Sequence, residues 1–467
     1  MRSRTTIFTL TLIALLAACG TANSASEPGP STSAATGSTS TSTTTPSTGP
    51  HDGDAGGGWI GGEPEWTTPH AEGGAVDKAA GGVAPMPATD SYAETAVPGG
   101  DVVQSDAGLR AGSVDDNADF DAYLEYLARI TDLGVVTRDF DPTGRVVVAV
   151  TGTTGLPVAG IEVAVSAGGA QVATIRTTAN GTARFLPALY GAQDAQSFTF
   201  AAGGATADAA PGGAVTLAVD AAGGATAPVP VDILFLLDAT GSMGDEIDRL
   251  KTTIDSVAER IAGLDSKPDV HFAMTLYRDL ADSFVTTTFD FTGDIQTFRG
   301  AIDDVVAEGG GDYPEAMDEG LAEAISAPSW RDPATTVQLV FLVADAPPQI
   351  ERTVQTPYPA SVVNAIARGI KVIPIASSES DDQAEAVFRQ IAEATGGRFV
   401  FLSYGAAGAA TGASTDIEIT DYEELSLDDL IVRLVSEELA ALTGVDPVPD
   451  TVPDTVVTTP PTNPPGQ

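Results

Sequence analysis

An apolar run that ends at a carboxylate constrains the fold of this chain more than any other feature. Residues Ile233 to Leu237 are all apolar, as in a strand covered on both faces of a parallel sheet. The run ends at Asp238, and hydroxyl side chains follow at Thr240 and Ser242. A strand that delivers these three side chains into one short loop places oxygen atoms around a single point, which suits a hard cation such as Mg2+.

The chain from residue 231 onward alternates between strand-like and helix-like segments, which predicts βα units. We expect an α/β fold in which a doubly wound, mostly parallel, six-stranded sheet occupies residues 229–445. The expected strands are 233–237, 270–277, 284–291, 337–343, 371–376 and 399–402. The expected helices are 246–264, 295–306, 315–325, 360–370, 384–395 and 427–442. Because only residues 278–283 join the second and third strands, that pair should form a hairpin.

Residues 1–18 have the pattern of a secretory signal, with a basic start (MRSR) and a short apolar core. That core is too short to span a bilayer. The sequence LAACG, which ends at residue 20, resembles the bacterial lipoprotein signal, in which the chain is cut before the cysteine and the thiol is lipidated. The resemblance implies a lipid anchor on Cys19 at the bacterial cell membrane or outer membrane, facing the extracytoplasmic side. An ordinary signal peptide with a chance cysteine is the alternative.

Composition separates the flanks from the rest of the chain. Residues 19–112 are rich in Ser, Thr, Gly and Pro and predict a disordered tether, and residues 446–467 predict a disordered Pro/Thr tail. The chain has 22 Lys and Arg against 64 Asp and Glu, a formal charge of −42. Such a charge repels phosphate backbones and anionic head groups, so we expect no nucleic-acid partner and membrane contact through the lipid anchor only.

Residues 113–228 are expected to hold a short helix followed by a small all-β sandwich. Apolar residues between 120 and 130 have helical spacing after an acidic stretch that suits a helix N-terminus. A calcium loop starting at Asp115 is the alternative, but its sixth position lacks glycine and its twelfth lacks glutamate. Short strand-like runs separated by turns fill residues 144–220 and favour the sandwich.

Two runs in this strand-like region, GLPVAGIEVAV and TANGTARF, carry a resemblance to a known family. They resemble the carboxypeptidase-regulatory-like β-sandwich domain found in many bacterial surface proteins. The resemblance implies a spacer or recognition module and no chemistry of its own.

Three segments that are far apart in the sequence are expected to meet at one edge of the main sheet. Asp238 ends the first strand, Asp345 follows the apolar run 339–344, and a glycine-rich loop extends from Gly309 to Glu315. In an open α/β sheet, ligands bind beyond the carboxyl ends of the strands at the switch point. We therefore expect a divalent-cation site at this edge. A solvated cluster of acidic loop ends is the alternative.

The motifs DATGSM, GGGDYPE and DAPP, in this order, resemble a von Willebrand factor type A (VWA) domain of the bacterial secreted kind. The resemblance implies a Rossmann-like fold with a metal-ion-dependent adhesion site whose ligands are Asp238, Thr240, Ser242, Asp312 and Asp345. Mg2+ is the expected cation, with Ca2+ or Mn2+ as alternatives. Asp312 stands where many relatives have threonine, and this extra carboxylate should strengthen metal binding and weaken the binding of acidic ligands. A degenerate, metal-free site is the alternative.

Two residues in the hairpin above the second strand are further candidates. Arg278 and Asp279 are expected either to rim the ligand-binding face or to form an ordinary turn pair.

The residues favour a binding protein over an enzyme. The three histidines form no zinc motif, and Ser242 has no histidine placed to act as its base. We expect a surface-tethered protein that binds an extracytoplasmic protein, or another surface ligand, through the metal site. The first alternative is a structural or assembly subunit of a cell-envelope complex with an unused metal site. The second is a hydrolase.

Overall fold

The computed structural model describes residues 110–225, 228–311, 313–377, 380–404, 409–410, 422–444 and 455–456. The expected signal peptide, Cys19 and nearly all of the expected tether lie outside these residues, as do Asp312 and most of the expected tail. None of the helices in this part of the chain is long and apolar enough to cross a membrane.

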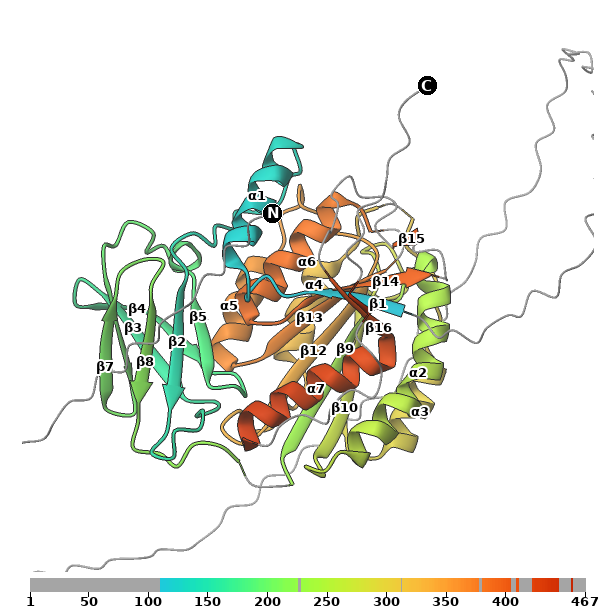
Figure 1. Ribbon diagram of the computed structural model, residues 1–467. Coiled ribbons are helices and arrows are strands. Elements are labelled where there is room, and N and C mark those ends of the chain that lie inside the picture. The colour runs from blue at the N-terminus through green and yellow to red at the C-terminus, as the bar shows by residue number, and fades with distance from the viewer. Residues whose placement is uncertain are drawn as a thin grey trace, which may run out of the picture. The chain divides into compact units, whose positions relative to one another are not determined.

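A central sheet organises the described residues (Figure 1). Its strand order is β11-β10-β9-β12-β13-β14-β1-β16-β17, and β15 pairs with β14. The strands are β1 (Arg110–Val114), β9 (Pro230–Asp238), β10 (Asp269–Tyr277), β11 (Thr286–Thr292), β12 (Val337–Ala344), β13 (Lys371–Ala376), β14 (Phe399–Tyr404), β15 (Ala409–Ala410), β16 (Glu423–Ser426) and β17 (Thr455–Val456). The predicted α/β class is therefore confirmed.

The six-strand count predicted for this sheet is too low, because the described residues contribute ten strands to it. The six expected strands correspond to β9–β14. The others are short and lack an apolar run, so local periodicity does not reveal them. Strand β1 takes residues 110–112 from the segment predicted to be disordered, and β17 takes two residues from the predicted tail.

The centre of the sheet is parallel and its edges are antiparallel. Strand β9 pairs in parallel with β10 and β12, β12 with β13, and β13 with β14. The predicted hairpin is present, since β10 and β11 pair antiparallel. All residues of β9 from Val231 to Asp238 are buried, as expected for a strand covered on both faces.

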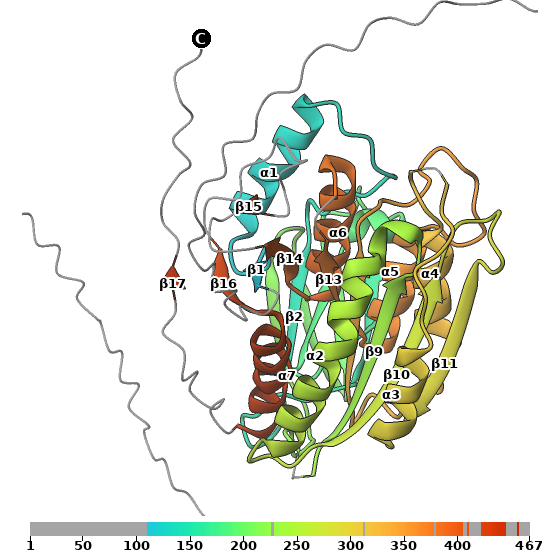
Figure 2. The same ribbon diagram turned by 90° about the vertical axis from the view of Figure 1, so that its right-hand side faces the viewer.

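Helices cover both faces of this sheet (Figures 1 and 2). Leu234 and Leu236 of β9 belong to one apolar core and Ile233, Phe235 and Leu237 to another, because successive side chains of a strand point to opposite faces. The first core includes residues of α4 (Met317–Ser326), α5 (Tyr358–Arg368) and α6 (Asp382–Thr395). The second includes residues of α2 (Gly244–Gly263), α3 (Ile295–Asp303) and α7 (Leu427–Thr443). The sheet is thus the middle layer of three.

Residues between 120 and 218 form a helix and two smaller sheets. Asp119 caps the N-terminus of helix α1 (Phe120–Asp132), and its carboxylate accepts from the backbone N–H of Ala122. One sheet has the order β5-β2-β8 and the other β4-β3-β6-β7. Their bounds are β2 (Val146–Thr151), β3 (Glu162–Ala167), β4 (Ala170–Arg176), β5 (Thr182–Phe185), β6 (Phe198–Ala202), β7 (Ala205–Ala209) and β8 (Ala214–Ala218). The likeness of this region to a regulatory-type sandwich remains a prediction.

Two glycines in helix interiors give a matched test of the packing. Gly320 of α4 lies against Tyr277, and a Cβ there would come within 2.6 Å of the Tyr277 ring, whereas a Cβ at Gly300 of α3 meets nothing within 4 Å. We expect Gly320→Ala to lower the free energy of unfolding by about 1–3 kcal/mol through overpacking. We expect Gly300→Ala to raise it by about 0.5–1 kcal/mol through helix propensity. Urea denaturation measures both, and equal effects at the two positions would contradict the packing described.

Candidate functional site at the carboxyl edge of the sheet

The site lies where β9 and β12 end side by side. Val343 of β12 pairs with Leu237 of β9, so Asp345 and Asp238 follow neighbouring strands at the same edge. Both side chains are buried. Burial, and after it the nearby Asp345 carboxylate, raise the pKa of Asp238 to about 7. The structure therefore brings together two of the three acidic residues expected here.

The loop after β9 turns its hydroxyl groups toward Asp238. The Thr240 hydroxyl donates to Asp238 Oδ1 at 2.7 Å, and the Thr240 backbone N–H donates to the same oxygen at 3.0 Å. Ser242 Oγ lies 3.3 Å from Thr240 Oγ1 and is exposed to solvent. One carboxylate and two hydroxyls thus form a line from the buried strand end to the surface.

The glycine-rich loop packs directly on this line. The backbone N–H of Gly241 donates to Gly309 O at 3.1 Å, and that of Glu308 donates to Ala239 O at 3.0 Å. A Cβ at Gly310 would come within 3.2 Å of the Thr240 Cβ, and Gly310 has a φ of +73°. Glycine is therefore required for this close approach. Asp312, expected to supply a ligand from the same loop, lies outside the described residues.

Glu315 is a member of this site that the sequence analysis did not include among the ligands. Its side chain is buried, and its Oε2 atom accepts no hydrogen bond within the described structure. Burial raises the pKa of Glu315 to about 8, and the carboxylates of Asp238, Asp279 and Asp345 act in the same direction. Its place at the end of the motif GGGDYPE is the one signal that could have identified it.

Tyr277 also belongs to the site and was missed. It ends β10 directly beside Asp238 in register and is fully buried. Burial raises the pKa of Tyr277 well above its ordinary value, and the negative charges of Asp238, Asp345 and Glu315 add to that effect. An apolar strand pattern does not indicate that the tyrosine at its end lies beside a carboxylate of a polar site.

The structure does not place Arg278 and Asp279 on an exposed rim, because their exposed fractions are only 6% and 7%. The Arg278 guanidinium donates from Nε to Ala239 O at 3.1 Å and from Nη2 to Val306 O at 2.8 Å. Asp279 accepts from the Gln349 side chain at 2.7 Å. Arg278 therefore joins the loop after β9 to the segment at Val306 through backbone carbonyls, which is a structural role and not that of a surface contact.

The donor set has the chemistry that a hard cation requires. Carboxylate and hydroxyl oxygens converge on one loop, and Asp238 Oδ2 is buried with no well-aligned hydrogen bond, although the Tyr277 hydroxyl acts on its carboxylate. Within the described residues, however, no three Asp, Glu, His or Cys side chains form a cluster that could hold a metal ion. Hydroxyls and Asp312 would therefore have to complete the coordination, and the metal site remains a prediction.

The fold and this edge define a class, an open α/β domain with an oxygen-rich loop site beyond its parallel strands. Residues 232–404 match the family model of the von Willebrand factor A domain. This part of the chain is a VWA domain.

Two curated proteins share part of this sequence. The alpha-protein kinase vwkA of Dictyostelium discoideum is 34% identical over 118 residues, which covers 25% of this chain and 18% of that protein. An ariadne-like RING finger protein of Acanthamoeba polyphaga mimivirus is 26% identical over 188 residues, covering 37% of this chain and 18% of that protein. The chain thus spans less than a fifth of the length of either relative.

Two solved structures give partial likenesses. The pilus adhesin SpaC of Lactobacillus rhamnosus GG has a TM-score of 0.31 at 11% identity, covering 53% of this chain and 33% of that one. The BatB protein of Bacteroides thetaiotaomicron has a TM-score of 0.31 at 14% identity, covering 45% of this chain and 98% of that one. Neither likeness bears on function.

Proposed function

We propose that this protein binds a protein partner through a divalent-cation-dependent site at the carboxyl edge of its VWA domain. Asp238, Thr240, Ser242 and Asp345 are the proposed ligands among the described residues, and Asp312 is added from the sequence motif. Mg2+ is the proposed cation, since carboxylate and hydroxyl oxygens suit a hard ion. When bound, the cation would supply an open coordination position for an oxygen atom of the partner.

Exposed apolar side chains around the site carry this proposal. Leu280, Val306 and Tyr313 are 44%, 60% and 47% exposed. The loops that bear them contact the site, because Arg278 binds both Val306 O and Ala239 O, and the Tyr313 hydroxyl donates to Asp345 O at 3.4 Å. Large apolar and aromatic side chains around a polar centre are typical of protein interfaces. The edge therefore suits a protein surface better than a small polar substrate.

The lipid anchor and the location form a further part of the proposal. A lipidated Cys19 followed by a long Ser/Thr/Gly-rich segment would tether the VWA domain to a membrane on the extracytoplasmic side. Metabolic labelling with a palmitate analogue tests the anchor, and unlabelled wild-type protein would contradict it.

No catalytic step is assigned, because Ser242 has Thr240 as its described neighbour and no histidine within hydrogen-bond reach among the described residues.

Capture of partners from the envelope of the source cell tests the binding role. Wild-type protein in Mg2+ should retain a defined set of partners that EDTA releases. Asp238→Asn should lose the same partners, since it removes the carboxylate at the centre of the site. Asp248→Asn is the matched control, because Asp248 is 79% exposed on α2. Partners that survive both EDTA and Asp238→Asn would instead favour the assembly-subunit interpretation.

The aspartate at position 312 should affect metal affinity. We expect Asp312→Thr to weaken Mg2+ binding about tenfold, because a carboxylate is exchanged for a neutral hydroxyl beside a divalent cation, a difference of roughly 1.4 kcal/mol. Titration calorimetry on the full chain measures the affinity, with Asp248→Asn again as the control. Equal or tighter Mg2+ binding by the Asp312→Thr variant would refute the expectation.

A further inference from the structure

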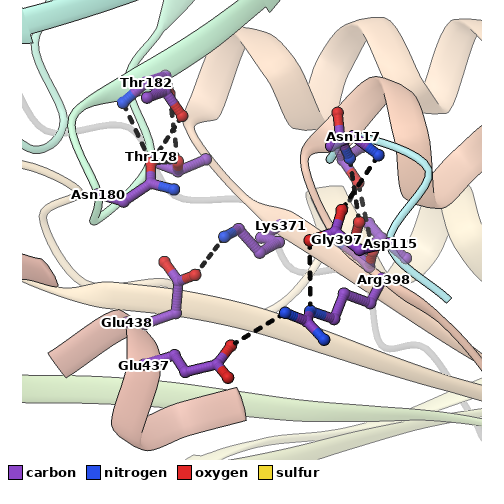
Figure 3. Close-up of polar contacts among 12 residues, drawn as sticks. Asp115, Asn117, Thr178, Asn180, Thr182, Lys371, Gly397, Arg398, Glu437 and Glu438 are labelled. Carbon is purple, nitrogen blue, oxygen red and sulfur yellow. Dashed lines mark hydrogen bonds and ion pairs between the residues drawn. The ribbon is translucent and has the colours of Figure 1, made fainter. Parts of the chain in front are cut away.

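A polar cavity lies at the opposite end of the main sheet from Asp238. It has a volume of about 210 Å3 and is lined by residues from β13, β5, α7 and the loop after β1 (Figure 3). Lys371, the first residue of β13, contributes to its wall, whereas Asp238 is the last residue of the parallel strand β9. This cavity is therefore separate from the proposed metal site.

Arg184 enters the cavity with a charge that no acidic side chain neutralises directly. Its Nε donates to Asn117 Oδ1 at 2.5 Å, and Nη1 lies 3.5 Å from Thr182 Oγ1. Across the described residues, no carboxylate forms an ion pair with it. Burial lowers the pKa of Arg184, and Glu393 partly offsets that effect. The four guanidinium hydrogens on Nη1 and Nη2 thus share at most one weak acceptor, the neutral Thr182 hydroxyl.

The close approach of Arg184 is built into the local backbone. The guanidinium lies against Gly396, at the C-terminus of α6, so closely that a Cβ there would fall 2.7 Å from Arg184 Cζ. Gly396 also has a φ of +80°. Glycine at this position therefore both ends the helix and leaves room for the guanidinium.

Two more donors face the same cavity. Lys371 is 5% exposed, and its Nζ donates to Glu438 Oε1, which uses one of its three hydrogens. Asn180 Oδ1 accepts from Thr178 Oγ1, Thr182 Oγ1 and Thr182 N, which fixes the orientation of the amide. The Asn180 amide nitrogen therefore points away from both threonines (Figure 3).

The charged side chains that line the cavity are equal in number, with Arg184, Lys371 and Arg398 against Asp115, Glu437 and Glu438. Lys371 is paired with Glu438, Arg398 lies 3.5 Å from Asp115, and Glu437 lies 3.0 Å from Arg433. Arg433 lies outside the cavity lining, and Arg184 is the lining cation that has no ion pair among the described residues. A cation without an ion pair is unexpected in a chain with a formal charge of −42, because carboxylates far outnumber cations in it.

We propose that this cavity is a binding site for a small oxyanion with a carboxylate or phosphate head, held by Arg184, Lys371 and Asn180. The planar guanidinium matches two oxygens of such a head, and Lys371 adds a point charge. The volume equals roughly seven water molecules at liquid density, which accommodates a small ion and excludes a peptide. Because Arg184 comes from β5 of a small sheet, Asn180 from the turn before β5, and Lys371 from the main sheet, a bound oxyanion would link the two regions.

Thermal unfolding of the full chain tests this site. The buffer is Tris at constant ionic strength, freed of divalent cations with a chelating resin, so that the proposed metal site has no part in the result. We expect acetate or phosphate, but not chloride, to raise Tm with saturation in the millimolar range or below. Arg184→Gln should weaken the apparent affinity at least tenfold. Arg176→Gln should leave it unchanged, because Arg176 lies in the neighbouring sheet, outside the cavity.

Labelling of the wild-type chain provides a second measurement that needs no variant. Phenylglyoxal modifies accessible arginines, and mass spectrometry reports each site. The oxyanion that raises Tm should protect Arg184 and leave Arg176 reactive. Comparison of the protection by acetate with that by phosphate identifies the preferred head group. Equal Tm shifts in wild type and Arg184→Gln, or no protection of Arg184 by either anion, would overturn the proposal without affecting the metal-dependent function.

Discussion

Arg389→Ala should lower the free energy of unfolding by about 3–5 kcal/mol, the range observed when one partner of a buried ion pair is removed. The Arg389 guanidinium of α6 donates to both carboxylate oxygens of Asp116, at 3.0 and 2.6 Å, and to Glu385 Oε1 at 3.2 Å. All three side chains are buried. The guanidinium also lies 3.6 Å from the centre of the Tyr126 ring, which adds a cation–π contact.

The large expected effect comes from what the substitution leaves behind. Without Arg389, the Asp116 carboxylate stays buried with no other ion-pair partner among the described residues. Loss of the pairing with Glu385 costs less. Burial raises the pKa of Glu385 to about 7 despite the opposing charge of Arg389, so this carboxyl can take up a proton when Arg389 is removed. The substitution also removes the ion pair that joins the segment before α1 to α6. We therefore expect α1 to lose protection against hydrogen exchange before the rest of the domain does.

Chemical denaturation with a matched control measures this effect. Arg299→Ala removes an arginine from an exposed pair with Asp255, whose side chains are 47% and 37% exposed, and should cost about 0–1 kcal/mol. Adding Asp116→Asn to Arg389→Ala should recover part of the loss, because the buried charge is then removed. A loss below 1 kcal/mol for Arg389→Ala alone would show that the pair is not buried as described.

The central part of the fold could be predicted because its strands are continuously apolar. Strands such as β12, in which every residue is buried, carry a strong local signal, and turns separate them clearly. Strand β1 carries no such signal. It enters the sheet by pairing Ala111 with Leu402, almost 300 residues away in the sequence, and Gly112 lies under the Phe401 ring. Pairing over that separation depends on tertiary packing, which local periodicity does not encode.

The site was predicted in part for a similar reason. Asp238 and Thr240 follow directly from where an apolar strand stops, so their positions could be read from the sequence. Arg278 could not be placed in this way, because its role depends on carbonyl groups of residues 239 and 306 that only the folded loops bring together. The burial of Glu315 likewise results from the packing of the glycine-rich loop against Thr240.

In the absence of divalent cations, the free energy of unfolding should fall as the pH rises from about 5 to 8. Asp238 has an ordinary pKa of 3.8 and a folded-state pKa of about 7. Between these values the native protein holds a proton that the unfolded chain has released. Stability is therefore greatest at the acidic end and is lost as the pH rises through 7. Glu315, with a pKa of about 8, extends the loss upward.

The contribution of Asp238 alone should be on the order of 2–4 kcal/mol, since each pKa unit corresponds to roughly 1.4 kcal/mol. Asp238→Asn removes this titration, so its stability should vary less with pH and should exceed that of wild type at pH 8 without metal. Glu315 and Glu385 titrate in both proteins, so their contributions largely cancel in the comparison. Wild type is thus expected to be less stable than the variant, because a cluster of carboxylates kept for function lowers the stability of the native protein.

Urea denaturation at pH 5, 6, 7 and 8 measures this dependence, with and without Mg2+. The cation should stabilise wild type most at pH 8, because it competes with the proton that Asp238 binds at lower pH. Asp238→Asn should gain little from Mg2+ at any pH, and Asp248→Asn should behave as wild type. If wild type and Asp238→Asn show the same slope in metal-free buffer, Asp238 is ionised throughout, and the carboxyl edge lacks the electrostatic strain that makes a cation site there plausible.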